Sequence, residues 1–137
     1  MFGKIEIPFG CVMLFNSVKL KPGVTIDDVE LLMGEMCNVV KNNYGDDEGG
    51  FIGGQVFRNA GFVSPEGSIQ GQDSEPGAGP GFDPGDVAII TYWQSFDQHE
   101  RSHADELFRE KFAALSEYCE QSWEIGYEML WQGLAGD

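Results

Sequence analysis

Hydrophobic and polar positions follow two different spacings along the chain, and these spacings predict alternating strands and helices. Residues 11–19 (CVMLFNSVK) are apolar and rich in β-forming residues, and a Pro-Gly pair soon follows them. Apolar residues then recur at helical spacing over residues 26–44. Thr25 and Asp28 stand at the spacing of a capping box, so the helix is expected to begin there.

The second half of the chain continues the pattern with three strands, one loop and one helix. They are predicted, in the order strand, loop, strand, helix and strand, over residues 51–62, 63–86, 87–93, 97–119 and 123–131. A Gly-Gly pair inside the first of these strands predicts a β-bulge. The helix is expected to bury one stripe of residues, namely Ala104, Leu107, Phe108, Phe112 and Leu115. The last strand alternates, so Glu124 and Glu128 share one face.

This order, β-α-β-β-α-β, predicts an α+β fold of the ferredoxin-like kind, with a four-stranded antiparallel sheet. At 137 residues the chain is expected to form one domain, residues 1–137. The 63–86 segment holds Gly, Pro, Ser and acidic residues, so it is a mobile loop or a functional lid. Two helices cover only one face of such a sheet. A homodimer or larger homo-oligomer that closes two sheets into a dimeric α/β barrel would cover the other.

The composition restricts the partners. There are 23 Asp and Glu against 8 Lys and Arg, a formal net charge of −15. Nucleic acids and anionic membranes attract the opposite sign, so neither is expected to bind. Three widely spaced cysteines argue for a reducing compartment, and no apolar segment approaches the roughly 20 residues that span a bilayer. With no recognisable signal peptide, a cytoplasmic location is expected.

Candidate chemistry centres on the two histidines of the chain, His99 and His103, at H-x-x-x-H spacing. Residues four apart on a helix lie one turn above each other, so the two imidazoles are able to share one metal ion. Such a pair is often only solvated surface. A carboxylate would complete a 2-His-1-carboxylate set of the non-haem iron type, and Glu124 and Glu128 are both available.

Cys37 is the second candidate for chemistry. It falls on the apolar face of the predicted helix over 26–44 and is expected to point into the core. A single cysteine there is most often a small apolar packing residue, and thiol chemistry would require access to a cavity and a lowered pKa.

Longer stretches around these residues resemble the sulfur oxygenase reductases. The resemblance lies in ITYWQSFDQHERSHADELF, in SWEIGYEMLW and in GEMCNVVKNNYGDDEGGFIGGQVF. It covers most of this chain but only about the amino-terminal half of a family member. It implies that His99, His103 and Glu124 hold a mononuclear non-haem iron and that Cys37 carries sulfur as a persulfide. The substrates implied are O2 and elemental sulfur or a related small sulfur compound.

Topology raises one condition for this site. The last strand of an ideal βαβ unit begins near the carboxyl end of the preceding helix, whereas His99 and His103 stand near its amino end. Either the helix must bend or the geometry must be irregular if Glu124 is to reach them, and Glu128 is the alternative ligand.

The main functional hypothesis is an iron-dependent oxidoreductase of the sulfur oxygenase reductase type. The second is a cofactor-free monooxygenase of the dimeric α/β-barrel kind that acts on a small aromatic metabolite. The third is a binding subunit with no catalytic activity.

Overall fold

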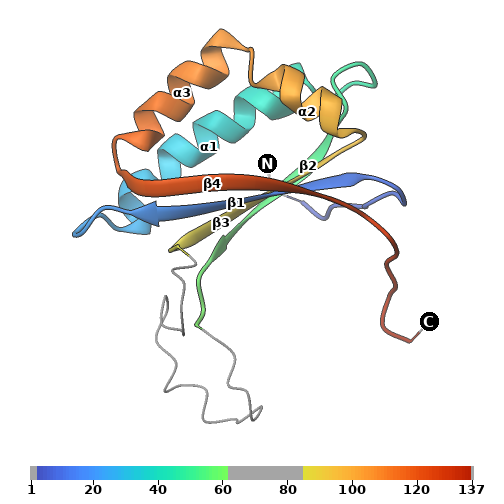
Figure 1. Cartoon of the computed structure of the whole chain (residues 1–137), viewed down its shortest axis with the longest axis horizontal. Helices are drawn as coiled ribbons and strands as arrows, with labels where there is room; N and C mark the ends of the chain where they lie inside the picture. Colours follow the sequence, from blue (N-terminus) through green and yellow to red (C-terminus); the bar gives the residue numbers. More distant parts are fainter. Residues whose placement is uncertain (1–2, 62–84, 137) are drawn as a thin grey trace.

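Four strands and three helices make up the part of the chain described by the computed structural model, residues 3–61 and 85–136 (Figure 1). The elements are β1 (Val12–Leu20), α1 (Ile26–Asn43), β2 (Phe51–Arg58), β3 (Val87–Trp93), α2 (Phe96–Ser102), α3 (Glu106–Ser116) and β4 (Cys119–Glu128). None of these helices is long and apolar enough to cross a membrane.

The strands form one antiparallel sheet in the order β2-β3-β1-β4, which leaves β2 and β4 at the edges. All three helices lie on the same face of this sheet (Figure 1). This is the ferredoxin-like α+β arrangement predicted from the sequence. The two central strands, β3 and β1, are hydrogen-bonded to a neighbouring strand along both of their edges.

The core fills the space between the helices and the inner face of the sheet. Its largest cluster of buried residues comes from α1, β1, β3 and α3, and consists of Val18, Leu20, Val29, Met33, Met36, Val87, Ile89 and Leu115. The α1 helix begins where the capping box predicts, because the Asp28 carboxylate accepts a hydrogen bond from the Thr25 amide at 2.8 Å. The apolar spacing over residues 26–44 therefore predicted both the helix and its buried face.

Two strands differ clearly from the prediction. β2 ends at Arg58 instead of residue 62, and β4 covers Cys119–Glu128 instead of residues 123–131. The predicted bulge is present, since the pairing of β2 with β3 shifts between Phe51 and Gly53. Residues 63–84 of the predicted loop lie outside the described residues.

The predicted helix over 97–119 is wrong in one respect, because it consists of two helices. α2 ends at Ser102 and α3 begins at Glu106. In between, the amides of His103, Ala104 and Asp105 bond to carbonyls three residues back, the tighter 3₁₀ pattern. Asp105 then begins α3, because its carboxylate accepts a hydrogen bond from the Phe108 amide at 2.9 Å. The strong capping preference of this aspartate explains the break.

The break also changes which residues are buried. Of the predicted stripe, Leu115 is buried and Phe108 is partly buried against the core. Ala104, Leu107 and Phe112 are exposed, contrary to the prediction. The tighter turn takes Ala104 out of the helical stripe, and of the stripe residues in α3 only Phe108 and Leu115 pack against the core.

The outer face of the sheet carries large apolar side chains that no helix covers. Phe15 on β1 pairs in register with Ile90 on β3 and Ile125 on β4, so all three point to this face. Trp123, Ile125 and Tyr127 of β4 are 40%, 44% and 52% exposed. The alternation predicted for the last strand is confirmed over these residues, and Glu124 points to the helices.

Candidate functional site

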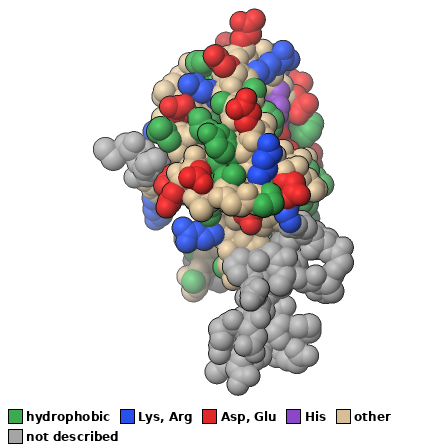
Figure 2. All heavy atoms as spheres, turned by 90° about the vertical axis from the view of Figure 1, so that its left-hand side faces the viewer, with side chains coloured by type: hydrophobic (Ala, Val, Ile, Leu, Met, Phe, Trp, Pro, Cys, Tyr) green, Lys and Arg blue, Asp and Glu red, His purple; other side chains and the backbone are tan. Residues whose placement is uncertain are grey.

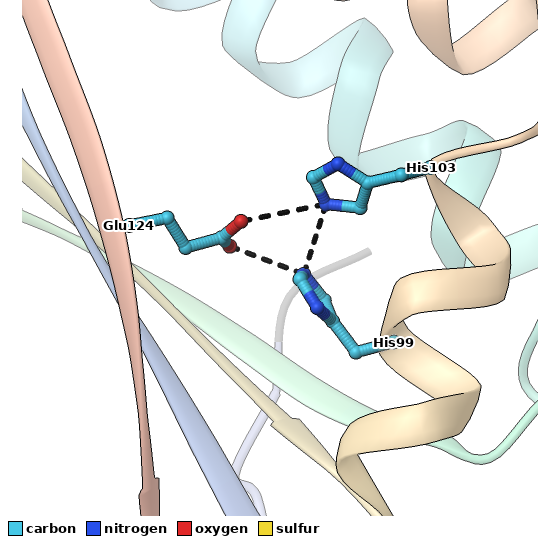
Figure 3. A group of neighbouring side chains, drawn as sticks. All are labelled: His99, His103 and Glu124. Carbon is cyan, nitrogen blue, oxygen red and sulfur yellow. Dashed lines mark hydrogen bonds and ion pairs between the residues drawn. The ribbon is translucent and has the colours of Figure 1, made fainter.

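His99, His103 and Glu124 come together beneath α2 (Figure 3). The Nε2 atom of His99 lies 3.1 Å from Oε2 of Glu124 and 3.0 Å from Nε2 of His103. The Nε2 atom of His103 lies 3.4 Å from the other carboxylate oxygen, Oε1. The structure thus brings together the three residues that the resemblance had grouped.

Strand length explains why Glu124, and not Glu128, meets the histidines. β4 follows α3 directly and runs in the opposite direction beneath it. Glu124 is five residues past Cys119, so it lies about 17 Å along the strand, while the 11 residues of α3 span about 16 Å. Glu124 therefore arrives beneath the break between α2 and α3. Glu128 lies about 13 Å further on.

Local hydrogen bonds hold the two histidines at one-turn spacing. Ser95 caps α2 by accepting a hydrogen bond from the Gln98 amide at 3.2 Å. His103 stands just after the last helical residue, but its backbone is still helical, with φ −70° and ψ −13°. Arg109 of α3 donates a hydrogen bond from Nε to the His103 carbonyl at 2.9 Å. The i, i+4 relation of the imidazoles therefore survives the break.

Contacts within the site shift the pKa values of Glu124 and His103. Burial raises the pKa of a carboxyl group, but in Glu124 the hydrogen bonds and charges of His103 and His99 outweigh burial and lower the pKa to about 2. The hydrogen bond that His103 donates to Glu124 raises the pKa of His103, against the effect of its partial burial. Glu124 is therefore a carboxylate at neutral pH, and it favours a proton on His103.

His99 is the buried member of the group, at 4% exposure. Its second ring nitrogen, Nδ1, is buried without a hydrogen-bond partner among the described residues. The nearest carboxylate oxygen, Oε1 of Glu100, lies 3.4 Å away, which is long for a hydrogen bond. Between the Nε2 atoms of His99 and His103 one nitrogen must donate and the other accept, so the tautomers of the two rings depend on each other.

Aromatic rings form the walls of the site. The Trp93 ring meets the His99 ring edge-on, with centroids 5.3 Å apart, and Phe108 lies 5.3 Å from His103. Phe96 covers Gly126, because a Cβ atom at Gly126 would lie 2.9 Å from the Phe96 ring. The Phe96 ring is itself half-exposed, so it stands between the solvent and the strand that carries Glu124.

The three polar side chains also have the composition of a metal site. One ligand atom from each lies within 4.8 Å of the others. Two imidazoles and one carboxylate suit several divalent first-row metals, so the donor set does not select one ion. Metal binding by His99, His103 and Glu124 stays a prediction.

Cys37 is half-buried on α1, and the group of three ligand-type residues does not include it. Burial raises the pKa of its thiol, whereas a nucleophilic thiol requires a lowered pKa. The role of Cys37 as a sulfur carrier stays a prediction.

The sequence analysis did not identify the residues that build the walls and the break. Phe96 lies against Gly126 in the wall of the site, and the sequence signal for this contact was a glycine on the same strand face as Glu124. Tyr44 supports the break, since its hydroxyl donates a hydrogen bond to the Asp105 carboxylate at 2.8 Å. A hollow of about 190 Å³ lies elsewhere, near Phe57 and Arg58 of β2, and contains none of the three polar residues.

Comparison with known proteins connects this chain to others through its fold. The chain has the ferredoxin-like fold. It is similar to SnoaB from Streptomyces nogalater, a cofactor-independent oxygenase, with a TM-score of 0.61, 13% identity, and coverage of 92% of this chain and 98% of that chain. Hydroxynitrile lyase from Passiflora edulis gives a TM-score of 0.60, 11% identity, and coverage of 93% and 100%.

A dimeric protein of unknown function with a ferredoxin-like fold, from Bacteroides fragilis, gives a TM-score of 0.53 at 13% identity, with coverage of 92% and 100%. At these identities the likenesses show the fold alone. No protein-family model matches the chain, and no curated protein matches it in sequence.

These comparisons correct the expectation of a mononuclear non-haem iron cofactor. SnoaB, which shares the fold over nearly the whole of both chains, is described as cofactor-independent, and three convergent side chains do not by themselves indicate iron. The comparisons also give no match to a sulfur oxygenase reductase. What they support is the ferredoxin-like fold, in neighbours that include dimers and enzymes.

Proposed function

We propose that this chain is an oxygenase of the cofactor-independent kind, which acts on a small aromatic substrate with an acidic C–H or O–H group. The observation that carries the proposal is the contact of a partly exposed imidazole, His103, with a partly buried carboxylate, Glu124, whose pKa is about 2. Such a pair forms a proton acceptor held beside aromatic walls. Two fold neighbours, a cofactor-independent oxygenase and a hydroxynitrile lyase, are enzymes.

The chemistry follows from what dioxygen requires. Without a cofactor, the substrate itself must supply the electrons, and its anion supplies them far more readily than its neutral form. In this proposal His103 accepts the proton that leaves the substrate. Glu124 stabilises the imidazolium that forms, because it remains ionised at neutral pH.

The reaction balances without any other reductant. A substrate methylene group and O2 give a carbonyl group and water: the carbon loses two C–H bonds, one oxygen atom forms the C=O bond, and the O–O bond breaks to release the other atom as H2O. The substrate carbon is oxidised and dioxygen is reduced. The proton held by His103 returns to the departing oxygen atom, so the imidazole is regenerated.

The aromatic walls favour a planar apolar substrate. Phe96 and Phe108 offer ring faces and edges on either side of the polar group. Each aromatic pair contributes about 0.5–1.5 kcal/mol beyond the area that it buries, so a flat ring is favoured over an aliphatic chain of similar size.

Oxygen consumption with a panel of hydroxylated aromatics tests the proposal, with elemental sulfur in the same panel as the competing substrate. We expect activity that survives EDTA treatment and falls about 10²–10⁴-fold in His103→Gln and Glu124→Gln proteins. Glu128→Gln is the matched control, since Glu128 lies on the same strand away from the histidines. Activity that needs an added metal, or that is unchanged in His103→Gln, would show that the proposal is wrong.

A further inference from the structure

Beyond the end of β4, residues 129–136 form an arm that carries large apolar side chains in solvent. Leu130, Trp131 and Leu134 are 88%, 81% and 79% exposed. The arm has no charged residue, although the whole chain carries a net charge of −15. Apolar groups in this number are costly to leave in water, so their exposure indicates a surface that another molecule covers.

The course of the arm is fixed by hydrogen bonds to the segment before β1. The Met129 amide donates to the Cys11 carbonyl at 3.0 Å, and the Gln132 side chain donates from Nε2 to the Ile7 carbonyl. In Figure 1 the arm leaves β4 and turns to the side of the sheet opposite the helices. It therefore enters the layer that a second sheet would occupy.

The outer face of the sheet has the matching character. It presents Phe15, Ile90, Trp123, Ile125 and Tyr127, and Lys19 is the one charged residue at an outer-face position of β1, β3 and β4. Charged side chains lie elsewhere, and Figure 2 shows acidic and basic groups side by side on another face of the molecule. Two strongly acidic chains repel each other, and this repulsion is weakest where the surfaces that meet are as poor in charge as these.

We propose that the 129–136 arm binds across the outer sheet face of a second copy of this chain, in a two-fold exchange that closes the dimer. A surface of this kind is self-complementary: each copy offers one arm and one apolar face. Covering Trp123, Tyr127 and Trp131 in both copies removes on the order of 800 Å² from water. The aliphatic side chains of the arm and the face bring the contact into the range of about 1,200–2,000 Å² that specific interfaces bury.

Two matched leucines test the role of the arm. Leu134 in the arm and Leu31 on α1 are almost equally exposed, at 79% and 74%. Sedimentation equilibrium over a dilution series would give the dimer dissociation constant of each variant. We expect Leu134→Asp to raise it at least tenfold and Leu31→Asp to change it less than threefold. Equal constants for the two variants, or a parent chain that is monomeric at about 100 μM, would overturn the proposal.

Trp131 supplies a second, independent measurement. In a Trp123→Phe protein the remaining tryptophans are Trp131 and Trp93, and Trp93 is buried at 1% exposure. Acrylamide quenching of the fluorescence then follows Trp131. We expect quenching to be efficient at concentrations where the chain is monomeric and to fall as dimer forms. Efficient quenching in the dimer, or protection already present in the monomer, would overturn the proposal, because the arm would then lie in solvent or on its own sheet.

Discussion

The Nε2 atom of His103 lies 3.0 Å from the Nε2 atom of His99, although His99 is buried and His103 reaches solvent. Two ring nitrogens at this distance form a hydrogen bond, in which one donates and the other accepts. Glu124 contacts both rings, one with each of its carboxylate oxygens, Oε2 to His99 and Oε1 to His103. The inner imidazole is thereby connected to solvent through the outer one.

Removal of the Glu124 charge is expected to lower the pKa of His103. The hydrogen bond and charge of Glu124 are the main causes that raise this pKa. In Glu124→Gln, burial and the charge of Arg109, which lower the pKa, are opposed only by the charge of Glu100. NMR titration of the imidazole protons in parent and variant would measure the change. A His103 pKa that is the same in both proteins would contradict the assignment.

The raised pKa also predicts how stability responds to alkali. A histidine whose pKa is higher in the folded than in the unfolded chain adds stability below the unfolded pKa of about 6.5. This contribution disappears as the pH rises through the folded pKa. The parent should therefore lose stability relative to His103→Gln as the pH rises from 6 to above the His103 pKa, which urea unfolding at each pH would show.

Glu124 predicts the opposite dependence at acid pH. Its pKa falls from 4.5 to about 2 on folding, so its contribution is complete above 4.5 and disappears as the pH falls towards 2. The shift corresponds to at most roughly 3 kcal/mol at neutral pH. Urea unfolding of the parent and Glu124→Gln should show a difference in free energy at pH 6 that shrinks by pH 3. Glu128→Gln, the control, should differ from the parent by less than about 0.5 kcal/mol at either pH.

Tyr44 is expected to support the histidine site from a distance. Its hydroxyl donates to Asp105, the residue that begins α3, and this hydrogen bond helps the Phe108 amide to lower the pKa of Asp105. Tyr44→Phe removes the bond and keeps the ring. We expect a loss of about 1 kcal/mol in unfolding free energy. Tyr118→Phe, at an exposed position, is the control and should have little effect.

The break between α2 and α3 shows where sequence patterns stop being informative. Apolar spacing predicted α1 because the helix packs on the core along its length, as Val29 and Met33 do. The same spacing continued through Ala104 and Leu107, where Asp105 and its bond to Tyr44 start a new helix. Tyr44 is 61 residues away in the sequence, so no local pattern contains this contact.

The polar site was predictable only in part for a related reason. The i, i+4 spacing of His99 and His103 is a local feature of the sequence, and the two rings do lie side by side in the structure. The choice between Glu124 and Glu128 depended on how far β4 runs back beneath α3, and this distance follows from the position of the break. From the residues alone both remained open, and the resemblance to another family selected Glu124. The aromatic walls depend on the same three-dimensional path.

Gly126 and Phe96 give a final prediction, because the ring occupies the space that a side chain at Gly126 would need. A Cβ atom there would lie 2.9 Å from the Phe96 ring and 3.3 Å from Leu14. Gly126→Ala should therefore destabilise the protein by about 1–3 kcal/mol through overpacking. In a Phe96→Ala background the space is free, and the same substitution should cost less than about 1 kcal/mol. Urea unfolding of all four proteins gives the coupling energy. A Gly126→Ala cost that is equal in both backgrounds would mean that the strand, and not the ring, resists the substitution.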